Sequence, residues 1–204
     1  LESGETNWQL GPPSPSQEDG SGAGGGGFDA GIDRASLRNA ALSYRDALTG
    51  ADYALRDLDL TASMRALDAP LRLEAAGVFQ EEAFEIDLRL ETPQALMSGQ
   101  PARAGIDFES GLADAGYDGA LTLADAPVLD GDFSLDARDL AGLAALAGTD
   151  AGIDLARIGR IRAEGRAEGP VAALQLGFSR LDLTGDLVEA GYEGRMTLSQ
   201  VPVL

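Results

Sequence analysis

The sequence predicts a mainly β protein whose strands follow one another as an antiparallel meander. Two observations support this prediction. From Phe28 onward, apolar and polar residues alternate with the two-residue period of a strand that has one dry face and one wet face. Turn-forming residues, chiefly glycine, proline and aspartate, separate these runs at spacings of about 8 to 15 residues. The alternation also argues against a parallel sheet covered on both faces, whose strands form continuous apolar runs.

Residues 1–27 differ from the rest of the chain and predict a flexible linker. Prolines are concentrated at 12–15 and glycines at 20–27, and the only charges are four acidic side chains. Such a composition buries too little apolar surface to offset the entropy of ordering. A phosphate-binding loop is not favoured, because no strand precedes the glycines and no Lys-Ser or Lys-Thr pair follows them. We therefore assign residues 28–204 to one β-region.

The clearest alternation runs from Phe84 to Glu91, where even positions are apolar and odd positions are charged. Shorter runs with the same pattern occupy residues 58–62, 71–75, 106–109, 133–135, 174–178 and 181–184. The residues between them predict turns at 49–50, 68–70, 92–93, 99–101, 118–119, 130–131, 169–170 and 184–186.

One strand is expected to contain an irregularity. Tyr53 and Leu55 precede the run at 58–62 but fall on the opposite phase. A β-bulge inserts one extra residue and shifts the phase by one. The sequence therefore predicts a bulge near Arg56 or Asp57.

A single short segment has helical rather than strand periodicity. Asp139 precedes it as a predicted N-cap and Gly148 follows as a predicted stop, which bounds a helix at about 139–147. Its apolar residues recur at i, i+3, i+4 and i+7: Leu140, Leu143, Ala144 and Ala147.

The chain also contains an internal repeat with an offset of 75 residues. Residues 115–129 and 190–204 share nine identities in fifteen aligned columns, including Gly-Tyr-x-Gly and a final Pro-Val-Leu. The partial copies lie around 105–135 and 180–204, so that the second is cut short. A period this long indicates several strands per unit. We expect the chain to be a piece of a longer repetitive protein.

Composition excludes most catalytic chemistry. The 204 residues include no cysteine and no histidine, and all fifteen basic residues are arginine. Thiol nucleophiles, Cys/His zinc sites, His-based acid–base pairs and Ser-Lys pairs are therefore absent. The chain is expected not to be an enzyme and to need no cofactor. Its formal net charge of -19 repels phosphate backbones, so no nucleic-acid partner is expected.

Two polar features have plain structural interpretations. The Asp130-Gly131-Asp132 segment offers oxygen ligands for calcium, but the spacing of a known calcium loop is missing, and no metal site is expected. Arg160, Arg162 and Arg166 share one strand face. They are interpreted as a wet face balanced by neighbouring acidic residues, in preference to a headgroup or phosphate contact.

The dry face is the most informative feature. A sheet must bury such a face against a second sheet, by closing into a barrel, or against an apolar ligand. The residues proposed to form an apolar lining for lipid are Phe84, Ile86, Leu88, Leu90, Phe108, Leu121, Leu123, Phe133, Leu135, Leu174, Leu176 and Phe178.

The segment from Ser36 to Thr61 resembles the AsmA family of bacterial envelope proteins. That family has an Asn, a Tyr-x-Asp-x-x-Thr-Gly motif and a Leu-x-x-Leu-x-Leu strand, matched here by Asn39, Tyr44, Asp46, Thr49, Gly50, Leu55, Leu58 and Leu60. Further similarity is seen at 69–71 with Gly77, at 92–96, and at 133–136 leading to Leu140 and Leu143. The resemblance covers about residues 32–204.

The resemblance implies a twisted, open, groove-like sheet with an aliphatic lining, related to the TamB-like bridge proteins. It implies a periplasmic location in a Gram-negative envelope, with an inner-membrane anchor outside this segment. The implied role is outer-membrane biogenesis through phospholipid transport, with phospholipid as ligand and no catalytic residues carried over. Protein partners are not indicated.

One alternative remains open at this point. The dry face may instead be packed against protein, which would make the chain a structural or scaffolding module without a lipid ligand. A secreted adhesin-like β-repeat fits less well, because the repeat is weak and a helix interrupts it.

Overall fold

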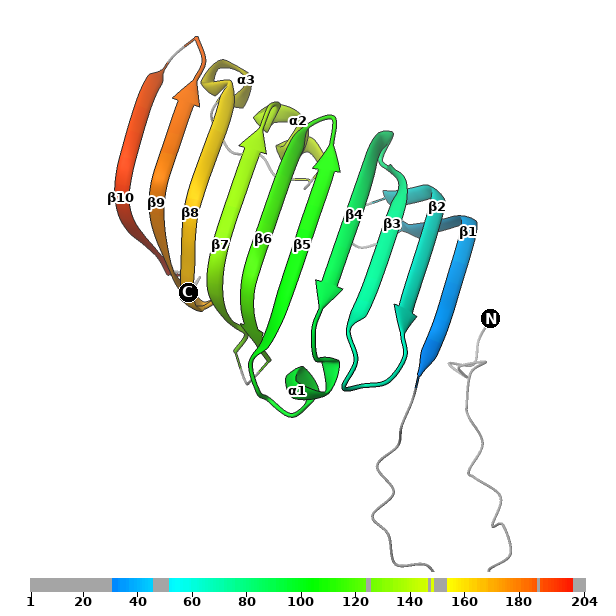
Figure 1. The fold of residues 1–204 in the computed structure, drawn as a ribbon. Coiled ribbons are helices and arrows are strands. Elements are labelled where there is room, and N and C mark those ends of the chain that lie inside the picture. Colours follow the sequence, from blue (N-terminus) through cyan, green and yellow to red (C-terminus); the bar gives the residue numbers. More distant parts are fainter. Residues whose placement is uncertain are drawn as a thin grey trace, which may run out of the picture.

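The computed structural model describes residues 31–45, 52–123, 126–146, 148, 154–186 and 188–199. Ten strands form one sheet in sequence order, each antiparallel to the next (Figure 1). Within the described residues β1 and β10 are the two edges, so the sheet is open. This confirms the mainly β class, the meander and the open sheet. The strands are β1 (Ile32–Arg45), β2 (Asp52–Met64), β3 (Leu71–Phe79), β4 (Glu82–Leu90), β5 (Ala102–Ser110), β6 (Ala113–Thr122), β7 (Val128–Ala137), β8 (Arg160–Pro170), β9 (Ala173–Thr184) and β10 (Glu189–Ser199).

Strand register places the two kinds of side chain on opposite faces. We call the face that carries Leu88 the apolar face and the face that carries Asp87 the polar face. Directly opposed residues of neighbouring strands share a face. One apolar row crosses β3 to β7 through Leu73, Leu88, Ile106, Tyr117 and Phe133.

The predicted bulge is confirmed at the predicted place. The β2–β3 register shifts between Arg56 and Asp59, and Asp57 has a φ of 52°. This left-handed conformation accommodates the extra residue and returns Leu58 to the apolar phase. On β1, Asn39 has a φ of 51°, and its N–H donates to the Asp59 carboxylate at 2.8 Å.

Three helices, rather than the single one expected, occur among the described residues. The predicted helix is α2 (Leu140–Leu146), and the Asp139 carboxylate caps it by accepting the Gly142 N–H at 2.9 Å. The other two are α1 (Pro93–Met97) and α3 (Leu155–Ile158), which are too short to show helical periodicity. The turn predicted at 92–93 opens α1, with Pro93 in its first turn. Among the described residues no helix has the length and apolar character needed to cross a membrane.

Two predicted turns, at 118–119 and 130–131, are wrong. Both pairs lie inside strands, where Gly119 of β6 faces Gly131 of β7. Tyr117 covers the two glycines, and a Cβ added to Gly119 would lie 2.7 Å from its hydroxyl oxygen. That hydroxyl donates to the Ala120 carbonyl at 2.8 Å and accepts the Asp130 N–H at 3.3 Å. These glycines therefore provide space for an aromatic ring instead of reversing the chain.

Tyr117→Phe is expected to lower the free energy of unfolding by about 1–2 kcal/mol, because two hydrogen bonds are lost while the ring stays in place. Urea denaturation followed by circular dichroism measures the change. Tyr44→Phe is the control, because Tyr44 is 58% exposed on the edge strand β1. An equal loss in both variants would contradict this role of the Tyr117 hydroxyl.

The two copies of the internal repeat occupy matching positions in the sheet. Tyr117 faces Ile106 in the first copy, and Tyr192 faces Leu181, 75 residues later. The registers agree at four successive pairs and separate at Gly194, next to a bulge in β9. The Tyr192 hydroxyl donates to a carbonyl three residues on, as the Tyr117 hydroxyl does.

The predicted linker at 1–27 lies outside the described residues, as do Asp46, Thr49 and Gly50 of the family-like motif.

Candidate functional site

The structure gathers almost all of the proposed lining residues on the apolar face. Register places eleven of the twelve there, from Phe84 on β4 to Phe178 on β9. Phe133 and Phe178 meet edge to face with ring centroids 5.7 Å apart. Leu123 is the exception, because it follows the end of β6 and is 48% exposed.

Most of this face has no second layer of protein over it. Among the described residues, the buried apolar side chains are Leu96 of α1 and six alanines, and no large side chain is fully buried. The larger residues of the face, such as Ile86 and Phe108, are only half-buried. At both edges the exposure rises, to 67% at Leu42 on β1 and 48% at Leu198 on β10. A two-layer core at native packing density would bury such side chains almost completely.

Helix α2 covers one end of the apolar face and encloses a cavity there. Gly142 lies beside Leu112 of the β5–β6 turn, and Gly148 lies near the Tyr53 hydroxyl of β2. The cavity between helix and strands has a volume of ≈ 320 Å³. Its lining is apolar except for Glu82 and Ser110, and comprises Leu55, Phe79, Phe84, Ile86, Phe108, Leu143 and Leu146.

Sequence reasoning missed four of these lining residues. Leu143 was identified only as part of a helix, and Leu146 falls outside the i, i+3, i+4, i+7 set. Leu55 and Phe79 belong to irregular ends of their strands. The helical spacing of Leu143 was the available signal, but it does not say which part of the sheet the helix covers.

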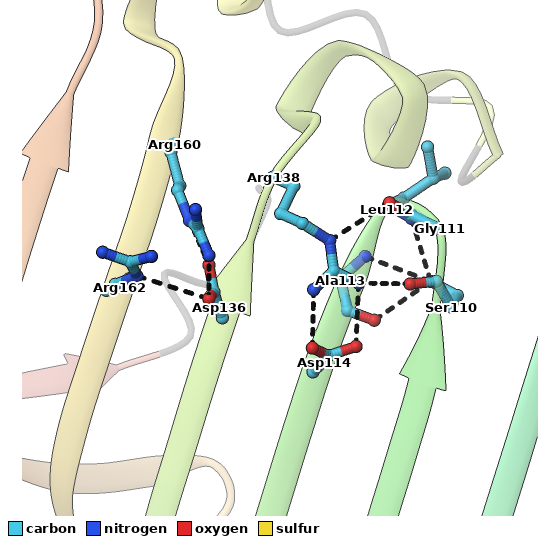
Figure 2. A network of polar contacts seen from close by, with 9 residues as sticks. All are labelled: Ser110, Gly111, Leu112, Ala113, Asp114, Asp136, Arg138, Arg160 and Arg162. Atoms are coloured by element: carbon cyan, nitrogen blue, oxygen red, sulfur yellow. Dashed lines mark hydrogen bonds and ion pairs between the residues drawn. The ribbon is translucent and has the colours of Figure 1, made fainter.

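A polar clamp centred on Arg138 fixes the start of α2 (Figure 2). The Arg138 guanidinium makes two hydrogen bonds to Asp114, at 2.5 and 2.8 Å, and also donates to the Gly111 and Ser110 carbonyls. The Arg138 backbone N–H donates to the Leu112 carbonyl at 2.8 Å. Because Asp139, the cap of α2, comes next, this clamp ties the helix to the β5–β6 turn.

The polar face carries a ladder of arginine–aspartate pairs. Arg160 and Arg162 both contact Asp136, and Arg166 contacts Asp130 at 2.5 Å (Figure 2 shows the Asp136 contacts). All three arginines thus have acidic partners, as the wet-face interpretation requires. The larger hollow of ≈ 720 Å³ over β4–β9 also lies on this face and is lined mainly by charged and glycine residues. Among the described residues no group of three or more acidic side chains is placed to hold a metal ion.

The hydrogen bond from Arg160, with further help from Arg162, lowers the pKa of Asp136 from 3.8 to about 2, against a smaller opposing effect of burial. A carboxyl whose pKa is lower in the folded state stabilises the fold above its unfolded pKa and loses that contribution as the pH falls. The contribution of Asp136 is therefore present above about pH 4 and is lost between about pH 4 and pH 2.

Asp136→Asn is expected to lower the free energy of unfolding by about 0.5–1 kcal/mol at pH 7, the upper range for partly exposed ion pairs. The difference from the unsubstituted chain should shrink as the pH is lowered from about 4 towards about 2. Urea denaturation at pH 7, 4 and 3 measures it. Asp132→Asn is the control, because its side chain is 78% exposed and its arginine is 3.7 Å away. A difference that stays constant with pH would contradict the proposed role.

No family model, curated protein or solved structure matches this chain.

Proposed function

We propose that this chain is a non-enzymatic, AsmA-like envelope module that binds phospholipid acyl chains on its apolar face. The observation that carries the proposal is a ten-stranded open sheet whose large apolar side chains remain half-exposed. A second sheet or barrel closure, the other ways to bury such a face, are both missing from the described residues. An apolar ligand remains as a cover.

Physical chemistry supports acyl chains as that ligand. Burial of apolar surface gains about 25 cal/mol per Å², so two acyl tails lying on the face gain several kcal/mol. These contacts have no fixed direction, and the row from Leu73 to Phe133 continues across strands without a charged residue. A tail is therefore able to move along the face without losing contact. The cavity under α2 falls in the size range of small-molecule sites and offers a more enclosed position.

The proposed setting follows from the same resemblance. We place the chain in the periplasm of a Gram-negative envelope, attached through an inner-membrane anchor outside this segment. Its role there is phospholipid transport in outer-membrane biogenesis. Ion-paired residues on the polar face keep that side hydrated while the apolar face carries lipid.

Native mass spectrometry of the chain, purified after expression in a Gram-negative host, tests lipid binding. Co-purifying phospholipid, together with saturable binding of the fluorescent fatty acid parinaric acid by delipidated protein, is the expected result. A lipid-free chain that does not bind parinaric acid overturns the proposal and favours the scaffolding module.

A further inference from the structure

The outer edge of β10 has an unsatisfied side. Among the described residues β10 pairs only with β9, and its other edge presents backbone groups without a partner strand. Apolar side chains stand exposed beside this edge: Tyr192 at 42%, Met196 at 45% and Leu198 at 48%. An edge of this kind is a template for another strand.

The internal repeat indicates which strand fits. β10 is the counterpart of β6, because the four register pairs around Tyr192 reproduce those around Tyr117. β6 has a second neighbour, β7, on the side that is open in β10. The sequence after β10 also repeats the approach to β7, since Pro202-Val203-Leu204 matches Pro127-Val128-Leu129.

The contacts between β6 and β7 define what the edge recognises. Gly119 faces Gly131, Tyr117 faces Phe133 and Ala115 faces Leu135. β10 offers the same three positions in Gly194, Tyr192 and Ala190. A Cβ at Gly194 would lie 2.5 Å from the Tyr192 hydroxyl oxygen, so the ring of Tyr192 covers its glycine as that of Tyr117 does. In the first copy Tyr117 also accepts the Asp130 N–H, whereas no described residue donates to the Tyr192 hydroxyl.

We propose that the free edge of β10 binds an antiparallel strand with the pattern of β7, placing glycine opposite Gly194, an aromatic residue opposite Tyr192 and leucine opposite Ala190. Charge adds to this specificity. Arg195 stands where the first copy has Ala120, which faces Asp130. Arg195 makes no ion pair with another described residue, and an incoming strand of this pattern brings an aspartate opposite it. This inference does not depend on lipid binding.

The test appends a copy of residues 130–137 directly after Leu204, where the 75-residue offset places it. A matched control carries the same extension with the copy of Gly131 replaced by valine, which would collide with Tyr192 and Gly194. Hydrogen exchange measured by mass spectrometry is compared across β10 and, as an internal reference, across β4. A synthetic peptide of residues 127–138, added to the unextended chain, provides a second measurement.

The matching extension is expected to slow amide exchange in β10 by about tenfold or more without changing β4, because edge amides become paired. The valine control is expected to leave β10 unprotected, and the peptide is expected to protect β10 in a concentration-dependent manner. Equal protection by both extensions, or protection by neither, overturns the proposal. Peptide protection found at β1 instead of β10 also overturns it.

Discussion

Leu88→Asp is expected to weaken parinaric acid binding more than about tenfold and to remove most co-purifying phospholipid. Leu88 lies in the middle of the apolar row, between Leu73 and Ile106. Losing one leucine contact costs about 1.5–3 kcal/mol, and a carboxylate placed against an acyl chain adds an unpaired charge. Each 1.4 kcal/mol corresponds to tenfold in the dissociation constant. Fluorescence titration and native mass spectrometry measure the two effects.

Two further variants separate binding from folding. Ala83→Asp adds the same charge to the same strand on the polar face and is expected to leave lipid binding unchanged. Leu143→Asp alters the α2 side of the cavity without altering any strand, and is expected to weaken binding even if Leu88→Asp unfolds the sheet. Unchanged lipid binding in a folded Leu88→Asp or Leu143→Asp variant would count against the apolar face as the binding surface.

Gly119→Val is expected to lower the free energy of unfolding by about 3 kcal/mol, because its side chain has no room. A Cβ there would lie 2.6 Å from the Asp130 carbonyl oxygen and 2.7 Å from the Tyr117 hydroxyl oxygen. Insertion therefore pushes β7 from β6 and displaces the covering ring. Chemical denaturation monitored by circular dichroism measures the loss.

Gly105→Val provides the matched control. Gly105 lies in β5 on the polar face, and the nearest atom to a Cβ there is an Asp118 carboxylate oxygen at 3.8 Å. Valine also favours strand conformation more than glycine does. The control is expected to be neutral or slightly stabilising. A similar loss in both variants would show that the Tyr117–Gly119–Gly131 packing has no special role.

The parts of the fold that depend on local alternation were predictable from sequence. The phase change after Leu55 located the bulge at Asp57, and Asp139 marked the start of α2. The Asp-Gly pair at 118–119 misled, because the same two residues favour a turn and also allow an aromatic side chain to cover a strand. The ring that decides between the two, Tyr117, acts through contact with the neighbouring strand β7.

The candidate site was predictable only in its residue composition. Alternation identifies the dry side of each strand, but it reads the same in a sandwich, a barrel or an open sheet. Whether that side is covered depends on contacts between distant elements. The position of Leu143 opposite Phe84 is one such contact, and it follows from the Arg138 clamp rather than from helical periodicity.

The strictly sequential strand order means that stability is shared only between immediate neighbours, as in a linear array. Loss of a terminal hairpin need not disrupt the middle, so breathing should start at the two ends and progress inward. Such a molecule can gain or lose whole hairpins over evolutionary time while the remaining ones keep their structure.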